Sequence, residues 1–103
     1  MMIEKPLREK DQAYLDWVKT LPSVVSGRPA DDPHHLIGHG TGGTGTKVSD
    51  YFTFPLTRTE HDESHNHGWR EWEERHGSQW GFVAATLLRA IREGILVRNG
   101  KRQ

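Results

Sequence analysis

The stretch DDPHHLIGHGTGGTGTKVSDYFTFPLTRTEHDESH, residues 31–65, decides the fold. The segment from Tyr51 to Phe54 predicts a strand because aromatic and β-branched residues favour pleated backbone. The segment from His34 to Ile37 predicts a second strand. Residues 38–47, which form most of the connection between them, hold five glycines and are too flexible for regular structure, so the strands pair as a hairpin. A helix from about Thr59 to His65 completes a β-β-α unit.

The histidines are unevenly spread along this stretch. Four of the seven lie in two tight groups, His34 with His35 and His61 with His65. Neighbouring residues on a strand point to opposite faces, whereas residues four apart on a helix point the same way. The spacing therefore predicts that His34, His61 and His65 converge on one metal ion. His35 remains for chemistry, and three ligands with open positions are typical of a catalytic site.

Helices are predicted on both sides of this unit. Asp11 caps a helix that runs to Leu21, a second helix covers Trp69 to His76, and a third covers Ser78 to Leu96. The apolar stripe of the last helix either closes the core or forms a homodimer seam, and the sequence leaves both open. With 103 residues and no internal repeat, the prediction is one α+β domain over residues 1–103.

Composition limits the class of protein. Hydrophobic residues make up 33% of the chain, so the core is small and its aromatic residues must carry much of it. The absence of cysteine excludes disulfides and thiolate metal sites. No apolar run reaches the roughly 18 residues that span a bilayer, and Met1 to Lys10 does not resemble a signal peptide. The expectation is a cytoplasmic protein with no membrane partner.

Three short motifs have weaker interpretations. Gly38 to Gly43 matches G-x-G-x-x-G, but no long helix follows it. Gly40 to Lys47 resembles a phosphate loop, but Thr46 separates Gly45 from Lys47 and no Ser or Thr follows the lysine. A hairpin connection is the better interpretation. The stretch from His61 to His65 is close to the H-E-x-x-H of zinc peptidases. However, Asp62 replaces the glutamate and would reach a metal-bound water poorly, so a peptidase ranks third among the functions considered.

Several segments of the chain, taken together, resemble the HNH (ββα-metal) endonucleases, in particular small phage and prophage HNH proteins. The resemblance is carried by Asp32-Pro33-His34-His35-Leu36-Ile37, Gly42-Gly43, Asp50 and His61-x-x-x-His65. The motif core covers residues 30–66, and the flanking segments extend the likeness over most of the chain. The resemblance implies a ββα-metal core hairpin and helix with flanking N- and C-terminal helices. A phage-encoded chain would act in the host cell cytoplasm.

The resemblance also implies a reaction. His34, His61 and His65 would bind one divalent ion, magnesium, manganese, nickel or zinc, in a DNA endonuclease. His35 would be the general base and Asp50 would orient it. DNA phosphodiester bonds would be cleaved to 5′ phosphate and 3′ hydroxyl products.

Contacts with DNA are predicted for three cations, Lys47, Arg58 and Arg70. Phosphate contacts of this kind give affinity without sequence choice. The net charge of zero counts mildly against DNA binding and favours weak binding or recruitment by a recombination or replication protein. The alternative function is a non-catalytic DNA- or protein-binding module on a degenerate HNH or zinc-ribbon scaffold.

One departure from the phage group concerns a second metal. Members usually hold a structural zinc through two pairs of cysteine or histidine ligands. Here those positions hold Ser23, Ser26, Thr57 and Glu60. Hydroxyl groups are poor zinc ligands beside thiolates, so no structural zinc is expected. Tryptophan-rich helices or association with another chain would replace its contribution to stability.

Overall fold

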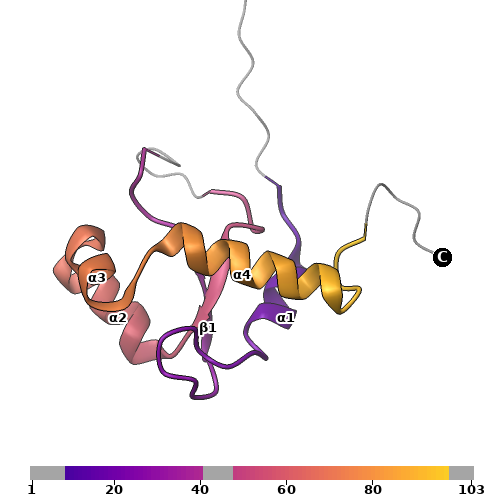
Figure 1. The fold of residues 1–103 in the computed structure, drawn as a ribbon, viewed down its shortest axis with the longest axis horizontal. Coiled ribbons are helices and arrows are strands. Elements are labelled where there is room, and N and C mark those ends of the chain that lie inside the picture. The colour runs from indigo at the N-terminus through magenta and orange to yellow at the C-terminus, as the bar shows by residue number, and fades with distance from the viewer. Residues whose placement is uncertain (1–8, 41–47, 98–103) are drawn as a thin grey trace, which may run out of the picture.

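The computed structural model describes residues 9–40 and 48–97 (Figure 1). Within these residues helices surround a small antiparallel sheet, so the α+β class is confirmed. The elements in chain order are α1 (Gln12–Val18), β1 (Asp32–His35), β2 (Thr53–Leu56), α2 (Arg58–His67), α3 (Trp69–His76) and α4 (Gln79–Arg92). Most of the predicted hairpin connection, with Lys47, lies outside the described residues. In the part described, no helix is both long and apolar enough to cross a bilayer.

The two strands pair with His34 opposite Phe54 and His35 opposite Thr53. The predicted strand bounds are wrong by two residues, since β1 begins at Asp32 and β2 runs through Pro55 to Leu56. Pro55 does not end β2. In a two-stranded sheet both strands are edges, where proline is tolerated.

The predicted helices are all present, with α3 at its predicted bounds. Asp11 caps α1 as expected, because its carboxylate accepts a hydrogen bond from the Tyr14 N–H at 2.9 Å. The other helix ends differ from the prediction. α1 stops at Val18 in a turn rather than at Leu21, and α4 stops at Arg92. Gly94 has a φ of 75°, and this left-handed backbone turns the chain back onto α4.

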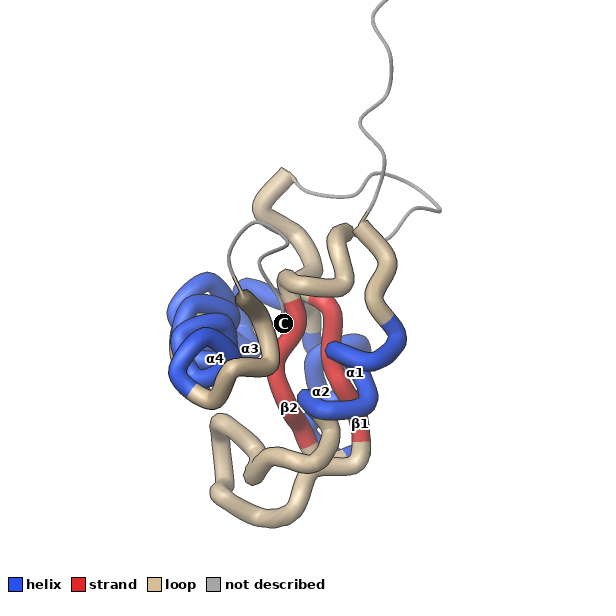
Figure 2. The backbone as a smooth tube through the Cα atoms, turned by 90° about the vertical axis from the view of Figure 1, so that its right-hand side faces the viewer, coloured by secondary structure: helices blue, strands red, loops and turns tan. Residues whose placement is uncertain are grey.

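The core consists of two groups of buried side chains that α4 connects. Val83 of α4 packs in the first group with Phe54, Leu56 and Trp72. Ala90, two turns later, packs in the second group with Tyr14 and Val18 of α1. Figures 1 and 2 show α4 running across the sheet toward α1. The inner side of the apolar stripe therefore closes the core, while Leu88 and Ile91 are exposed on the outer side.

A buried hydrogen-bond cluster ties the loop of residues 22–29 to the start of α2. The Ser23 hydroxyl donates to Glu60 Oε1 at 2.6 Å, and the Thr57 N–H donates to the same oxygen at 2.8 Å. Burial acts to raise the pKa of Glu60, but these hydrogen bonds lower it below its ordinary value. Three of the four positions at which the resemblance predicts lost zinc ligands thus contact one another here by hydrogen bonds. The absence of a structural zinc stays a prediction.

Candidate metal centre

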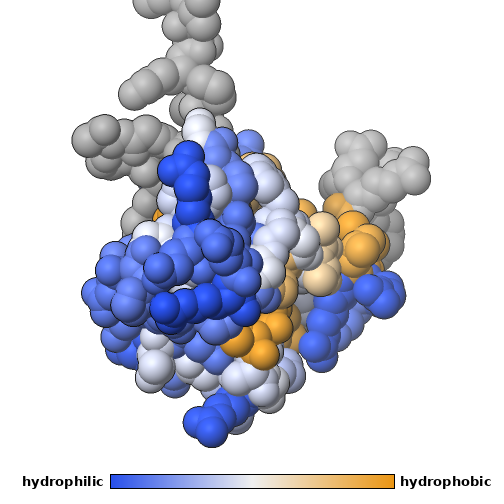
Figure 3. All heavy atoms as spheres, turned by 60° about the vertical axis from the view of Figure 1, so that its left-hand side comes forward, coloured by the Kyte–Doolittle hydropathy of each residue, from blue (hydrophilic) through white to orange (hydrophobic). Residues whose placement is uncertain are grey.

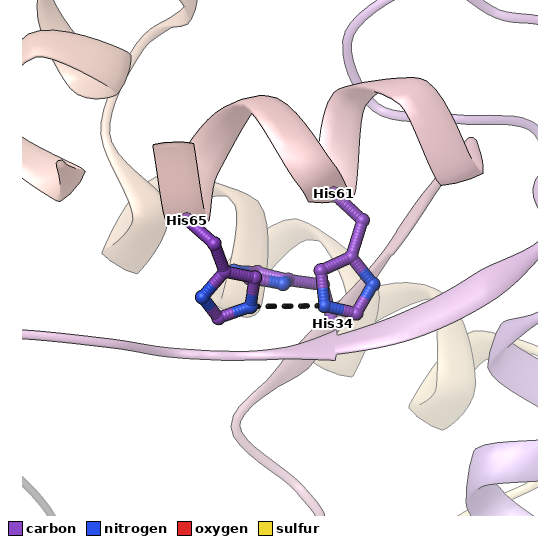
Figure 4. Close-up of side chains that lie close together, drawn as sticks. All are labelled: His34, His61 and His65. Atoms are coloured by element: carbon purple, nitrogen blue, oxygen red, sulfur yellow. Dashed lines mark hydrogen bonds between the residues drawn. The ribbon is translucent and has the colours of Figure 1, made fainter. Parts of the chain in front are cut away.

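The structure brings the three predicted ligands together. One ring nitrogen from each of His34, His61 and His65 lies within 4.8 Å of the others. Figure 4 shows the rings meeting between β1 and the helix α2. Nε2 of His61 and Nε2 of His65 are 3.2 Å apart. The His34 ring centroid lies 4.7 Å from that of His61 and 5.8 Å from that of His65.

Local structure explains this convergence. His61 and His65 are one helical turn apart, and the capping box of Thr57 and Glu60 fixes the start of their helix. His34 is only 2% exposed because the rings of Phe54 and Trp72 pack against it. His65, in contrast, is exposed. The group is therefore buried on the strand side and open to solvent on the helix side.

The chemistry of the three rings fits a metal ion. Nδ1 of His34 is buried and has no hydrogen-bond partner in the described part of the chain. Burial, and then the neighbouring His61 and His65, lower the pKa of His34 to about 3, so its ring is neutral at pH 7. Neutral imidazole is a good ligand for zinc, nickel and copper, whereas magnesium prefers oxygen. The donor set favours a transition metal over magnesium.

Asp32 is a site residue that the sequence analysis missed. Its Oδ2 lies 3.1 Å from Nδ1 of His61, and Arg58 donates to both of its oxygens at 2.7 and 2.8 Å. Hydrogen bonds from Arg58 lower the pKa of Asp32 below its ordinary value, although burial acts to raise it. A carboxylate on Nδ1 fixes the tautomer that leaves Nε2 as the ligand atom. The predicted strand began at His34, so the sequence analysis did not place Asp32 on the strand face that carries this ligand.

Asp32→Asn is expected to weaken metal binding by about 10- to 100-fold, as loss of an outer-shell partner does elsewhere. Asparagine keeps the shape but removes the negative charge that holds the His61 ring. Titration of zinc or cobalt against a chromophoric chelator measures this effect. Asp62→Asn, on the exposed side of α2, is the control. Equal affinities for the two variants would remove Asp32 from the site.

The predicted base and its orienting carboxylate also meet. Nε2 of His35 lies 2.9 Å from Oδ1 of Asp50, which is 3% exposed. The Asp11 N–H donates to the other carboxylate oxygen at 2.8 Å, so the start of α1 helps to hold this pair. Because strand side chains alternate, His35 faces away from His34. The backbone donor at Asp11 is a long-range contact that no local sequence signal indicates.

The predicted DNA contacts have different surroundings. The guanidinium of Arg58 is paired with Asp32, although its side chain is 66% exposed. That of Arg70 lies 4.6 Å from the centroid of the Trp69 ring. The remaining described histidines each lie beside a glutamate rather than in the metal group: His39 by Glu73, His67 by Glu71, and His76 by Glu63.

Glu73 stabilises the fold in a pH-dependent way. Its Oε2 lies 2.8 Å from His39 Nε2 and accepts from the Gln79 N–H at 2.9 Å. Burial acts to raise the pKa of Glu73, but these hydrogen bonds lower it below the ordinary value of 4.5. A carboxyl whose pKa is lower in the folded state stabilises the protein above the unfolded pKa. This contribution is lost as the pH falls through the folded pKa.

Glu73→Gln is therefore expected to cost about 1–2 kcal/mol of unfolding free energy at pH 7, and progressively less as the pH falls below about 4.5. Urea denaturation of wild type and Glu73→Gln at pH 7 and at pH 4 measures the loss of unfolding free energy at each pH. Glu74→Gln, at an exposed neighbouring position, is the control. A difference between wild type and Glu73→Gln that does not change with pH would contradict this account.

Comparisons with known proteins describe the chain without assigning an activity. Residues 1–94 match the model of a family described as "Protein of unknown function (DUF968)". The chain is 45% identical over 96 residues to "Uncharacterized protein YdfU" of Escherichia coli strain K12. The match covers 93% of this chain and 27% of that protein, so the chain spans about a quarter of the relative's length. No solved structure matches.

Proposed function

We propose that this chain, which belongs to the DUF968 family of proteins of unknown function, is a metal-dependent endonuclease acting on DNA. One observation carries the proposal. Three imidazole nitrogens lie within 4.8 Å of one another at a site open to solvent, and the next residue on the strand is a fourth histidine bonded to a buried carboxylate. The HNH resemblance predicts this combination of a ligand set and an oriented base.

His34, His61 and His65 would hold one divalent ion. When bound, the ion supplies a Lewis acid that stabilises charge on the scissile phosphate and on the departing 3′ oxygen. The half-open arrangement leaves room for water and phosphate oxygens, since the exposed His65 borders the solvent. Asp32 and Arg58 keep the His61 ring in its binding orientation.

The proton transfer is assigned to His35. With Nε2 bonded to the Asp50 carboxylate, the ring carries its proton on Nε2 and uses Nδ1 as the basic nitrogen. Nδ1 would accept a proton from the attacking water. Asp50, held in turn by the Asp11 N–H, keeps the ring from rotating and stabilises the imidazolium that forms.

Plasmid nicking tests the proposal. Purified protein freed of metal is incubated with supercoiled plasmid and zinc, nickel, manganese or magnesium, with EDTA as the control. We expect conversion to open-circular DNA with at least one of the transition metals and none with EDTA. Absence of cleavage of both the plasmid and a single-stranded circular DNA with every metal, under conditions where the protein binds the metal, would overturn an endonuclease.

A non-catalytic DNA- or protein-binding module is the second candidate. Its protein-binding form is favoured by the zero net charge and by the ion pairs that occupy Arg58, Arg75 and Arg89. Strong attraction to DNA phosphates is not expected from such a charge distribution. This candidate predicts binding that persists in EDTA and is not followed by cleavage.

A further inference from the structure

A cluster of aromatic rings lies near the metal centre and takes no part in it. We call His39, Phe52, Trp69 and Trp80, together with Arg70, the aromatic patch. The ring centroids of His39 and Trp69 are 4.2 Å apart, those of His39 and Trp80 are 6.4 Å apart, and those of Phe52 and Trp80 are 5.3 Å apart. Trp80 is 40% exposed. Part of the Trp80 side chain is therefore accessible to a ligand.

The backbone beneath the patch is held in an unusual conformation. Gly38 and Gly40 have φ values of 78° and 73°, and between them His39 has a φ of 58°. Among the described residues, His39 is the sole non-glycine with positive φ. Contacts with Glu73 and the Trp69 ring hold it there. Conformations of this kind persist where the surroundings fix them, and they cluster at ligand-binding sites.

Gly38 allows the Trp69 ring to rest directly on the backbone. A Cβ atom at this glycine would lie 2.2 Å from two atoms of the indole, which is far too close. The indole is therefore fixed in position, and the guanidinium of Arg70 lies over its ring. A preformed aromatic surface with an attached cation can bind a nucleic acid without first paying to order its side chains.

Two short segments of chain connect the metal ligands to the patch. Gly38 follows the ligand His34 by four residues and Trp69 follows the ligand His65 by four residues. Four residues of chain span at most about 14 Å. Both segments that supply metal ligands therefore lead to the patch, and one DNA strand can contact the two sites together.

Base stacking rather than charge distinguishes an unpaired strand from a duplex at this patch. Because the chain has no net charge, attraction to phosphates is expected to be weak for both. Stacking of an unpaired base on an aromatic ring contributes about 1–3 kcal/mol, and nearby arginine adds to it. In a duplex the base faces are already stacked on one another. An aromatic surface therefore adds affinity for an unpaired strand that it cannot add for a duplex.

The side of the molecule that carries α2 and α3 lacks the large apolar area of a protein-docking surface. Hydrophilic residues dominate the side that comes forward in Figure 3, which carries α2 and α3. Hydrophobic residues gather in smaller groups at its lower edge and toward the C-terminal side. Protein-docking surfaces are usually marked by larger continuous apolar areas.

We propose that the aromatic patch binds unpaired bases of a DNA strand beside the metal centre. The substrate class is then single-stranded DNA, or duplex DNA with an unpaired segment, rather than a continuous duplex. Trp80 supplies the stacking face, and Arg70 contacts a phosphate of the same strand. The link to cleavage rests on the proposed function, but the binding itself needs neither metal nor catalysis.

Fluorescence anisotropy in EDTA tests the binding. Labelled oligo(dT) and a labelled duplex of equal length are titrated with wild type, Trp80→Ala, Trp80→Phe and Leu88→Ala. We expect wild type to bind the single strand more tightly than the duplex. Trp80→Ala should weaken single-strand binding by about 5- to 150-fold, the equivalent of one stacked base. Trp80→Phe keeps a stacking face and should recover most of the affinity.

Leu88→Ala is the matched control because it removes a 54% exposed apolar side chain from the same helix. Its single-strand affinity should equal that of wild type, and circular dichroism checks that all variants are folded. Unchanged binding by Trp80→Ala, tighter binding of the duplex, or no single-strand binding by wild type would each overturn the proposal. Single-strand binding without cleavage under any metal would support the patch and overturn the endonuclease, so the two failures are distinguishable.

Discussion

His35→Ala is expected to slow plasmid nicking by about 10²- to 10⁴-fold, the usual contribution of a positioned general base. The His35 ring is bonded to Asp50 and is not one of the three rings that converge on the metal position. Metal affinity should therefore stay within about twofold of wild type. Initial nicking rates with the most effective metal, and a zinc or cobalt titration of the same preparations, measure the two quantities.

His76→Ala is the control for this variant, since it also removes a histidine bonded to a carboxylate, that of Glu63. Its nicking rate should match wild type. Asp50→Asn provides a second variant. The amide can donate a hydrogen bond to Nε2 of His35 and so stabilise the wrong tautomer, which should also slow nicking with metal affinity preserved. Nicking by His35→Ala at the wild-type rate would remove this residue from the proton transfer.

His65→Ala should reduce affinity for zinc or cobalt by more than about 100-fold, a greater loss than that of an outer-shell partner. The variant removes one of three nitrogens that lie within 4.8 Å of one another. Because His65 is exposed, the unfolding free energy without metal should change by less than about 0.5 kcal/mol. Metal affinity and stability are thus separable at this position.

His67→Ala is the matched control, because this exposed histidine is on the same helix and lies outside the metal group. Isothermal titration with zinc should give one site per chain for wild type and for His67→Ala, and no tight site for His65→Ala. The visible spectrum of bound cobalt reports the same change independently. Wild-type affinity in His65→Ala would show that the three rings do not bind one ion.

The metal group illustrates why some site predictions survive errors in secondary structure. Both strands were misplaced by two residues, yet side chains alternate with a period of two, so a shift of two leaves each on its predicted face. His34 therefore faces α2, and His35 faces Asp50. The spacing of His61 and His65 did not depend on the helix bounds, because any helix through both residues brings them to one side.

The sequence by itself determined the β-β-α order, the faces of the histidines and the cap at Asp11, because each depends on periodicity or on neighbours a few residues apart. Only the tertiary structure decided which residues, distant in the sequence, hold the histidines and carboxylates of the site in place. Asp32 reaches His61 across 29 residues and the Asp11 N–H reaches Asp50 across 39. Trp69 rests on Gly38. Such contacts depend on how helices pack against the sheet, and the energy that selects that packing is summed over the whole core rather than stored in any short segment.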